Sequence, residues 1–179
     1  MTDQIKIADY IFEKYISKEE IDKRVKEIAT IISNDYKDKE PVILLTLKGA
    51  IIFGADLMRE ITIPLKVETI IAKSYGNNIQ TSGAVNILQN QVDFKNKDII
   101  IIEDIVDTGL TMKKLLEHLK KEGARSIEIC TLLYKPDNIV EKVDIKYCGF
   151  SIMPLFVVGY GLDYAEYGRN LKDIYIKIK

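Results

Sequence analysis

The feature that most constrains the fold of this chain is a run of four isoleucines at residues 99–102, which leads directly into two acidic residues. The run is continuous and apolar but too short for a typical helix, so it predicts a strand with both faces buried. Strands of that kind occur in parallel sheets that are covered by helices. A helical pattern follows the acids, which indicates a strand–helix unit of an α/β fold.

Other segments supply the neighbours of that strand. Short apolar runs predict further buried strands at residues 42–47, 67–72 and 127–134. Helical spacing of apolar residues predicts helices at residues 17–36, 49–60 and 108–122. Ser17 opens the first of them with a capping box, and Gly123 ends the last. Because strands and helices alternate through short connections, the sequence predicts a parallel sheet with helices on both faces.

The remaining segments are less regular. Residues 74–82 are polar and rich in Gly and Asn, which predicts a mobile loop, and residues 84–88 are expected to pair with residues 66–73 as a hairpin. The last third, from Lys135 onward, predicts a small lobe, or hood, over the edge of the sheet. The chain contains no repeat, low-complexity tract or interdomain linker, so we expect one domain over residues 1–179.

Charge and residue types argue against several classes of function. Lys and Arg total 26 and Asp and Glu total 27, so the net charge of −1 indicates no polybasic surface for nucleic acid. No apolar run approaches the ~18 residues that a membrane span needs, and the N-terminus lacks a signal peptide's apolar core. We therefore expect a cytoplasmic protein. The single histidine, His118, is expected on a solvated helix face, which leaves the chemistry to carboxylates, lysines and backbone amides.

The segment that carries chemistry is EDIVDTGLT, residues 103–111, at the end of the isoleucine strand. Ligands of open α/β sheets bind beyond the carboxyl ends of the strands. The helix start that follows offers backbone N–H groups to a phosphate, and Thr108 and Thr111 add hydroxyl donors. Because carboxylates repel a phosphate, Glu103 and Asp104 must bind something else. Ribose hydroxyls and a hydrated magnesium ion are the natural candidates.

This segment closely resembles the phosphoribosyl pyrophosphate (PRPP) signature of type I phosphoribosyltransferases. Further segments resemble the hypoxanthine-guanine branch of that family, in its order and with similar separations. They are LKGA at 47–50, KSYG at 73–76, KP at 135–136, FVVGYGLDY at 156–164 and RNL at 169–171. The resemblance spans roughly residues 40–176 and implies the type I phosphoribosyltransferase fold, an α/β parallel sheet with a hood.

The resemblance also implies how PRPP is held. Glu103 and Asp104 are expected to hold the ribose hydroxyls with magnesium nearby, and Asp163 resembles a second magnesium ligand near the pyrophosphate. The turn that wraps the 5-phosphate is expected to consist of Asp107, Thr108, Gly109, Leu110 and Thr111.

The pyrophosphate end of PRPP is expected to meet a different set of residues. Lys48 and Gly49 would hold it, through a non-proline cis peptide after Leu47, and Arg169 would be the second contact. Ser74 and Tyr75 resemble the tip of the family's closing loop, which shields the reaction from water.

The base end of the site follows from the same resemblance. Phe156 is expected to stack on the purine, the backbone of Val157 to meet its polar edge, and Lys135 to donate to the 6-oxo group, with Asp163 bordering the site. Asp107 is expected to take the proton from the imidazole part of the purine as general base.

The activity that the resemblance implies is magnesium-dependent transfer of phosphoribosyl from PRPP to hypoxanthine, and to guanine, giving IMP or GMP and pyrophosphate. Its partners are small molecules, without nucleic acid or membrane, and family members are commonly homo-dimers or homo-tetramers. Pro154 and Leu155 depart from the family pattern beside the base pocket, so a xanthine-preferring phosphoribosyltransferase is an alternative. A PRPP- or nucleotide-sensing regulator with the same fold is another. Gly168 is also unusual, and we expect it to loosen Arg169.

Overall fold

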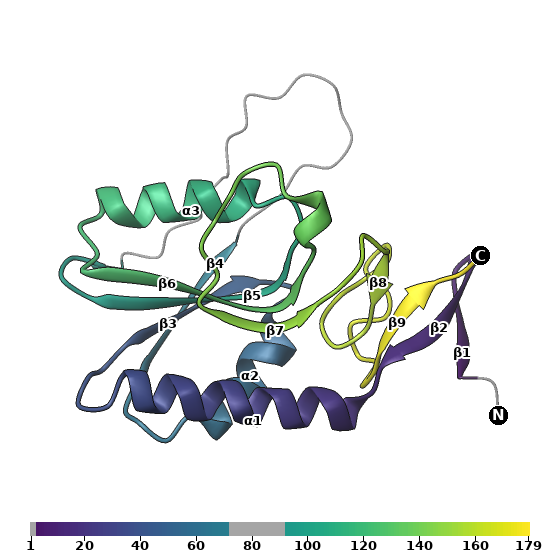
Figure 1. The fold of residues 1–179 in the computed structure, drawn as a ribbon, viewed down its shortest axis with the longest axis horizontal. Coiled ribbons are helices and arrows are strands. Elements are labelled where there is room, and N and C mark those ends of the chain that lie inside the picture. The colour runs from purple at the N-terminus through teal and green to yellow at the C-terminus, as the bar shows by residue number, and fades with distance from the viewer. Residues whose placement is uncertain (1–2, 72–91) are drawn as a thin grey trace.

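The computed structural model describes residues 3–71 and 92–179 of the chain. The predictions for the loop at residues 74–82, including Ser74 and Tyr75, and for the hairpin strand at residues 84–88 lie outside the described residues. Two sheets and three α-helices make up the described part of the fold (Figure 1).

The larger sheet has five strands, and every neighbouring pair in it is parallel. In spatial order the strands are β4 (Lys66–Ile71), β3 (Val42–Leu47), β5 (Asp98–Val106), β6 (Ser126–Tyr134) and β7 (Tyr147–Ser151). The isoleucines at residues 99–102 lie in β5, the central strand, and all of them are fully buried. The prediction of an α/β fold around a parallel sheet is confirmed.

Helices cover both faces of this sheet, as predicted (Figure 1). α1 (Lys18–Asp35) and α2 (Ile51–Glu60) pack on one face, and α3 (Leu110–Lys121) packs on the other. Successive side chains of a strand point to opposite faces, so the isoleucines of β5 divide between the two cores. Ile100 and Ile102 pack with α1 and α2, and Ile99 and Ile101 pack with α3.

The hood is a four-stranded antiparallel sheet at one end of the larger sheet (Figure 1). In spatial order its strands are β1 (Gln4–Ile7), β2 (Tyr10–Ile16), β9 (Ile174–Lys177) and β8 (Val157–Val158). The predicted hood is present, with β8 and β9 from the last third of the chain, and it also contains β1 and β2 from the start of the described chain. β2 pairs with β9, so the two ends of the chain share one sheet.

Two strand predictions need correction. Residues 67–72 were expected to form a buried strand, but β4 lies at the edge of the sheet and only Ile70 of its residues is buried. The central strand does not end at the isoleucines, because its pairing with β6 continues as far as Val106. Glu103 and Asp104 therefore lie within β5 and are held in place by the sheet.

The helix predictions hold with small changes. The capping box at Ser17 is present at the start of α1. α3 begins two residues later than predicted, because Gly109 takes a φ of 80° as its N-cap, and the chain leaves the helix at Gly123 with a φ of 79°. His118 is half-buried, and its Nε2 has no hydrogen-bond partner among the described residues, so the expectation of a solvated position is wrong.

In the part of the chain that the structure describes, no helix combines the length and apolar character needed to cross a membrane.

Candidate active site

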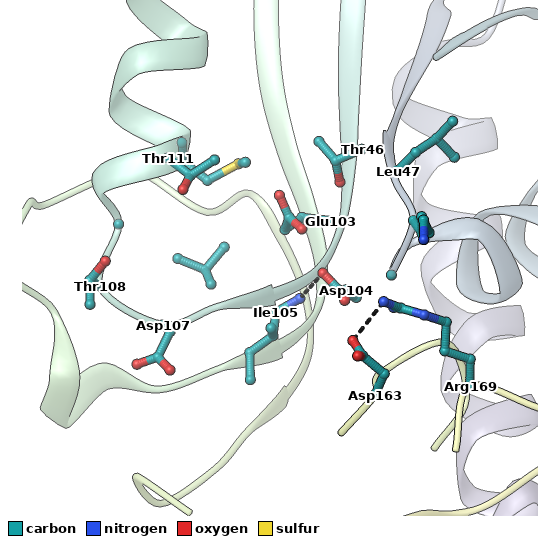
Figure 2. A pocket seen from close by; sticks show the side chains of 15 residues that line it. Thr46, Leu47, Glu103, Asp104, Ile105, Asp107, Thr108, Thr111, Asp163 and Arg169 are labelled. Carbon is teal, nitrogen blue, oxygen red and sulfur yellow. Dashed lines mark hydrogen bonds and ion pairs between the residues drawn. The ribbon is translucent and has the colours of Figure 1, made fainter. Parts of the chain in front are cut away.

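A cavity of about 480 Å³ opens at the carboxyl ends of β3 and β5 (Figure 2). Its walls come from the ends of these two strands, the start of α3, and the hood segment that follows β8. The lining residues are Thr46, Leu47, Lys48, Gly49, Glu103, Asp104, Ile105, Val106, Asp107, Thr108, Gly109, Thr111, Met112, Asp163 and Arg169. The structure thus brings together most of the residues that the sequence assigns to PRPP.

The wall formed by the end of β3 has the backbone features that the sequence predicts. The peptide bond between Leu47 and Lys48 is cis, which confirms that prediction. Gly49 follows it, and a Cβ at this position would lie only 1.6 Å from Oδ2 of Asp104. A side chain at residue 49 would therefore displace the carboxylate of Asp104, so the close approach of β3 to the acids of β5 requires glycine here.

The opposite wall is the turn from β5 into α3. The first N–H groups of a helix have no earlier turn to bond, so those of α3 are available to an anion in the cavity. The turn is braced from outside, because the N–H groups of Val140 and Glu141 both donate to the carbonyl oxygen of Thr108, at 3.0 Å each. A Cβ on Gly109 would meet the carbonyl oxygen of Glu141 at 2.0 Å. These contacts therefore fix the shape of the turn, which lines the cavity.

The floor of the cavity is the carboxylate pair Glu103 and Asp104 (Figure 2). Burial raises the pKa of Glu103 well above its ordinary value, and the hydrogen bond and charge of Asp104 raise it further. Asp104 accepts a hydrogen bond of 2.9 Å from the N–H of Ile105. Within residues 3–71 and 92–179, neither carboxylate forms an ion pair with a side chain of the protein. The two carboxylates are hydrogen-bonded to each other, and Glu103 also to Thr46, so the pair has hydrogen-bond partners but no cation in the described part of the chain.

The predicted magnesium ligands do not form one compact cluster. No group of three or more His, Cys, Asp or Glu side chains among the described residues is close enough to hold a metal ion. Glu103 and Asp104 lie on the floor, whereas Asp163 lies on the hood side and is paired with Arg169 at 2.7 Å (Figure 2). Magnesium commonly takes only one or two carboxylates and completes its shell with water and substrate phosphates, so this donor set fits it.

Asp107 lies just beyond β5 and is held by two donors. Lys135 Nζ donates to its Oδ2 at 2.9 Å, and Asn138 Nδ2 donates to its Oδ1 at 2.8 Å. Partial burial alone would raise the pKa of Asp107, but the hydrogen bonds from Lys135 and Asn138 outweigh it and lower that pKa. Asp107 is therefore a carboxylate at neutral pH, which a general base must be.

Two cations and two carboxylates face one another where the hood meets β3. Arg169 pairs with Asp163 and donates to the carbonyl oxygen of Gly161 at 2.8 Å. Glu166 lies 3.3 Å from Arg169 Nη2 and 3.0 Å from Lys48 Nζ, and the hydrogen bond from Lys48 lowers the pKa of Glu166 most. The guanidinium of Arg169 thus has three partners, although its buried Nε has none among the described residues. Whether Gly168 loosens Arg169 stays a prediction.

Of the residues expected at the purine, Asp163 lines the cavity, whereas Phe156, Val157 and Lys135 do not. Phe156 is 47% exposed, and its ring meets the ring of Tyr164 edge-on, with 5.8 Å between the ring centroids. Val157 is buried in β8. Lys135 is only 7% exposed and is committed to Asp107. None of the three lines the cavity, so the structure does not gather the expected base site into the same enclosed space. Leu110, expected in the phosphate turn, is also absent from the lining.

Some neighbours of the site were missed by sequence reasoning. Thr46 lines the cavity from β3, Asn138 holds Asp107, and Glu166 meets Lys48 and Arg169. Each lies within three positions of a predicted site residue in the sequence, and this closeness is the only signal that the sequence offers for them. Their partners lie on other segments, so their roles depend on the fold.

Comparison with known proteins agrees with this geometry. A model of the phosphoribosyl transferase domain matches residues 14–165, and the chain therefore belongs to the phosphoribosyltransferase family.

Within that family, this chain is similar to hypoxanthine-guanine phosphoribosyltransferases. It is 45% identical over 162 residues to the one from Bacillus subtilis, covering 89% of each chain, and 40% identical over 166 residues to the one from Mycobacterium tuberculosis, covering 89% of this chain and 82% of the relative. A crystal structure of a hypoxanthine-guanine phosphoribosyltransferase from Bacillus anthracis superimposes with a TM-score of 0.86 at 38% identity. That match covers 93% of this chain and 98% of the other.

Proposed function

We propose that this chain is a purine-salvage enzyme that transfers the 5-phosphoribosyl group of PRPP to hypoxanthine and guanine, giving IMP or GMP and pyrophosphate. The observation that carries the proposal is the single cavity in which a carboxylate pair lies between a phosphate-binding turn and two cations. PRPP has a ribose between a phosphate and a pyrophosphate, so its three parts match these three features in order.

The turn from Asp107 to Thr111 would bind the 5-phosphate through the amides of the start of α3 and through the hydroxyls of Thr108 and Thr111. Glu103 and Asp104 would accept hydrogen bonds from the ribose hydroxyls. Lys48 and Arg169 would bind the pyrophosphate, where the planar guanidinium can make two parallel hydrogen bonds.

The charge of the cavity supports a requirement for magnesium. Among the described residues, its lining contains four carboxylates and two cationic side chains, Lys48 and Arg169. Asp107 is paired with Lys135 and Asp163 with Arg169, so within the described chain Glu103 and Asp104 are the carboxylates without a cation, and a polyanionic substrate would need cations to approach them. Glu103, Asp104 and Asp163 are the residues that would hold magnesium, which would neutralise charge on the pyrophosphate as it departs.

Asp107 would act as general base. Asp107 accepts hydrogen bonds from Lys135 and Asn138, and its lowered pKa keeps it ionised at neutral pH, the form in which it can accept a proton. A purine placed beside Asp107 can give its imidazole proton to Oδ1 or Oδ2, while Lys135 has its ammonium within reach of the same region to donate to a 6-oxo group. Adenine presents an amino group there, a donor that cannot accept from the ammonium of Lys135, whereas a 6-oxo group can accept from it beside Asp107, which favours 6-oxopurines.

Three broader parts of the proposal have separate support. The two ends of the chain share the hood sheet, which supports one domain over residues 1–179. Cys130 and Cys148 are free, as is usual for proteins of the reducing cytoplasm. The family resemblance supports a homo-dimer or homo-tetramer, which sedimentation of the purified protein would measure.

The test is to incubate the protein with PRPP, magnesium chloride and each purine in turn, and to measure nucleotide and pyrophosphate. We expect hypoxanthine to give IMP and guanine to give GMP, each with one pyrophosphate per nucleotide. Without magnesium we expect no nucleotide. Turnover with xanthine alone would identify a xanthine-preferring enzyme instead. Binding of PRPP without turnover of any base would indicate a nucleotide-sensing protein and would overturn the proposal.

A further inference from the structure

One carboxylate sits between the two cations of the cavity. Oε2 of Glu166 accepts from Lys48 Nζ at 3.0 Å and from Arg169 Nη2 at 3.3 Å. Lys48 comes from the end of β3 and Arg169 from the hood, so a single anionic group links two walls of the site (Arg169 is shown in Figure 2). An incoming anion must meet the same two cations.

The backbone of Glu166 is anchored while its side chain is exposed. Tyr164 and Tyr167 exchange two backbone hydrogen bonds of 2.9 Å, and between them Ala165 and Glu166 take φ values of 51° and 68°, which residues other than glycine seldom adopt. The N–H of Glu166 also donates to Asp163 at 2.8 Å. The tight turn thus fixes where the side chain starts. The side chain itself is 66% exposed, so it can swing away without loss of packing.

Arg169 does not depend on Glu166 for its position. The guanidinium also pairs with Asp163 at 2.7 Å and donates to the carbonyl oxygen of Gly161 at 2.8 Å. Glu166 is the weakest of the three partners by distance, at 3.3 Å. Removal of its charge therefore leaves Arg169 oriented and exposes it, together with Lys48, to another anion.

We propose that Glu166 is an affinity-determining residue that competes with pyrophosphate for Lys48 and Arg169. This inference rests on the proposed function, because it takes these two cations as the pyrophosphate contacts. Binding of PRPP displaces the carboxylate into solvent. After transfer, the carboxylate of Glu166 returns to the two cations and helps to expel the product pyrophosphate. Glu166 therefore lowers the affinity of the enzyme for pyrophosphate and favours its release.

The test compares Glu166→Gln with wild type by calorimetric titration of pyrophosphate in magnesium buffer. Gln keeps the size of the side chain and removes its charge. An exposed ion pair contributes little energy and two such pairs are lost together, so we expect the Kd for pyrophosphate to fall by roughly threefold to tenfold. We also expect the KM for PRPP to fall while kcat does not rise, because tighter binding of pyrophosphate slows its release.

Glu27→Gln is the matched control. Glu27 pairs with Arg24 at 2.8 Å, three residues away, as Glu166 does with Arg169, but it lies on α1 and outside the cavity lining. This variant makes the same change in net charge and is expected to leave both constants at the wild-type values. An equal fall of the Kd in the two variants would overturn the inference, since it would reflect net charge alone.

Two other outcomes separate this inference from the proposed function. If wild type binds pyrophosphate and turns over, but Glu166→Gln binds it equally well or more weakly, then Glu166 is not a competitor and only this inference fails. If wild type neither binds pyrophosphate nor produces it from PRPP, the proposed function itself fails.

Discussion

At the amino end of β5, the carboxylate of Asp98 is enclosed by donors, whereas at the carboxyl end Glu103 and Asp104 face an open cavity. Asp98 is 4% exposed and accepts from Arg125 Nε at 2.8 Å and from Ser126 Oγ at 2.7 Å, with a second guanidinium nitrogen of Arg125 also in contact. The hydrogen bonds from Arg125 lower the pKa of Asp98 to about 2.

The contrast shows what each end of the strand contributes. A buried charge costs free energy unless it is paired and hydrogen-bonded, and the chain itself meets that need at Asp98. At the other end it does not: burial and a like-charged neighbour raise the pKa of Glu103 instead. Such local conflicts concentrate at functional sites. We therefore expect changes at the carboxyl end to reduce activity and changes at the amino end to reduce stability.

The largest effect is expected for Asp107→Asn, beyond the carboxyl end of β5. Asn keeps the shape of the side chain but cannot accept the purine proton, so turnover should fall by roughly 10²- to 10⁴-fold, the usual contribution of a general base. PRPP binding should be largely retained, because the amides of the phosphate turn are unchanged. Steady-state rates and titration with PRPP would measure the two quantities.

The same variant also tests the comparison of the two ends. Its free energy of unfolding, from urea denaturation, should fall by about 1–2 kcal/mol, because the buried ammonium of Lys135 loses its charged partner but keeps the amide oxygen of Asn as an acceptor. Unchanged turnover would remove Asp107 from its role as base. A large loss of stability would show that the carboxyl end of β5 is a structural site as well.

The second prediction concerns the amino end. Asp98→Asn leaves Arg125 without its charged partner and should lower the free energy of unfolding by about 2–3 kcal/mol, less than a fully buried pair because the arginine is largely exposed. kcat and KM of the folded protein should match wild type at 25 °C. Reduced turnover with unchanged stability would reverse the proposed division of roles.

The two ends also differ in how far sequence reveals them. The strands at residues 42–47, 99–102 and 127–134 are continuous apolar runs, and the acids, turn and helix start at residues 103–111 form one contiguous motif. Local patterns of this kind were sufficient for the sheet, for the helices on its two faces, and for most of the cavity lining. The cis peptide before Lys48 was likewise predicted, from the resemblance of LKGA to the family.

Features that depend on contacts between distant segments were missed. β2 is a strand of the hood because β9, at the far end of the chain, pairs with it. Asn138 and Glu166 gain their roles only when folding places them against Asp107 and Lys48. The exposure of half of the residues of β4 follows from its place at the sheet edge, which an apolar run does not specify.

A third prediction is the pH dependence of stability. The pKa of Asp98 is about 2 in the folded protein and about 3.8 in the unfolded chain, so its contribution to stability is fully present above pH 4 and is lost as the pH falls through 2. The difference in unfolding free energy between wild type and Asp98→Asn should therefore shrink by about 2 kcal/mol between pH 5 and pH 2. Urea denaturation of both proteins across this range would measure it. A difference that is independent of pH would show that the charge of Asp98 is not the stabilising element.

The smallest effect is expected from changing a donor of Asp107, the carboxylate just beyond the carboxyl end of β5. Asp107 receives one neutral donor, Asn138, besides Lys135, and Asn138→Ala removes its 2.8 Å hydrogen bond to the carboxylate. The pKa of Asp107 then rises, so the acid limb of the pH profile of kcat/KM should move to higher pH by roughly half a unit to one unit. Asn138→Asp should move it further, because a like charge would face the base. Acid limbs that coincide with wild type in both variants would show that Asp107 does not set the acid limb. A shift in Asn138→Ala and a larger one in Asn138→Asp, in proteins that remain active, would show that Asn138 tunes the pKa of the base and is not required for folding.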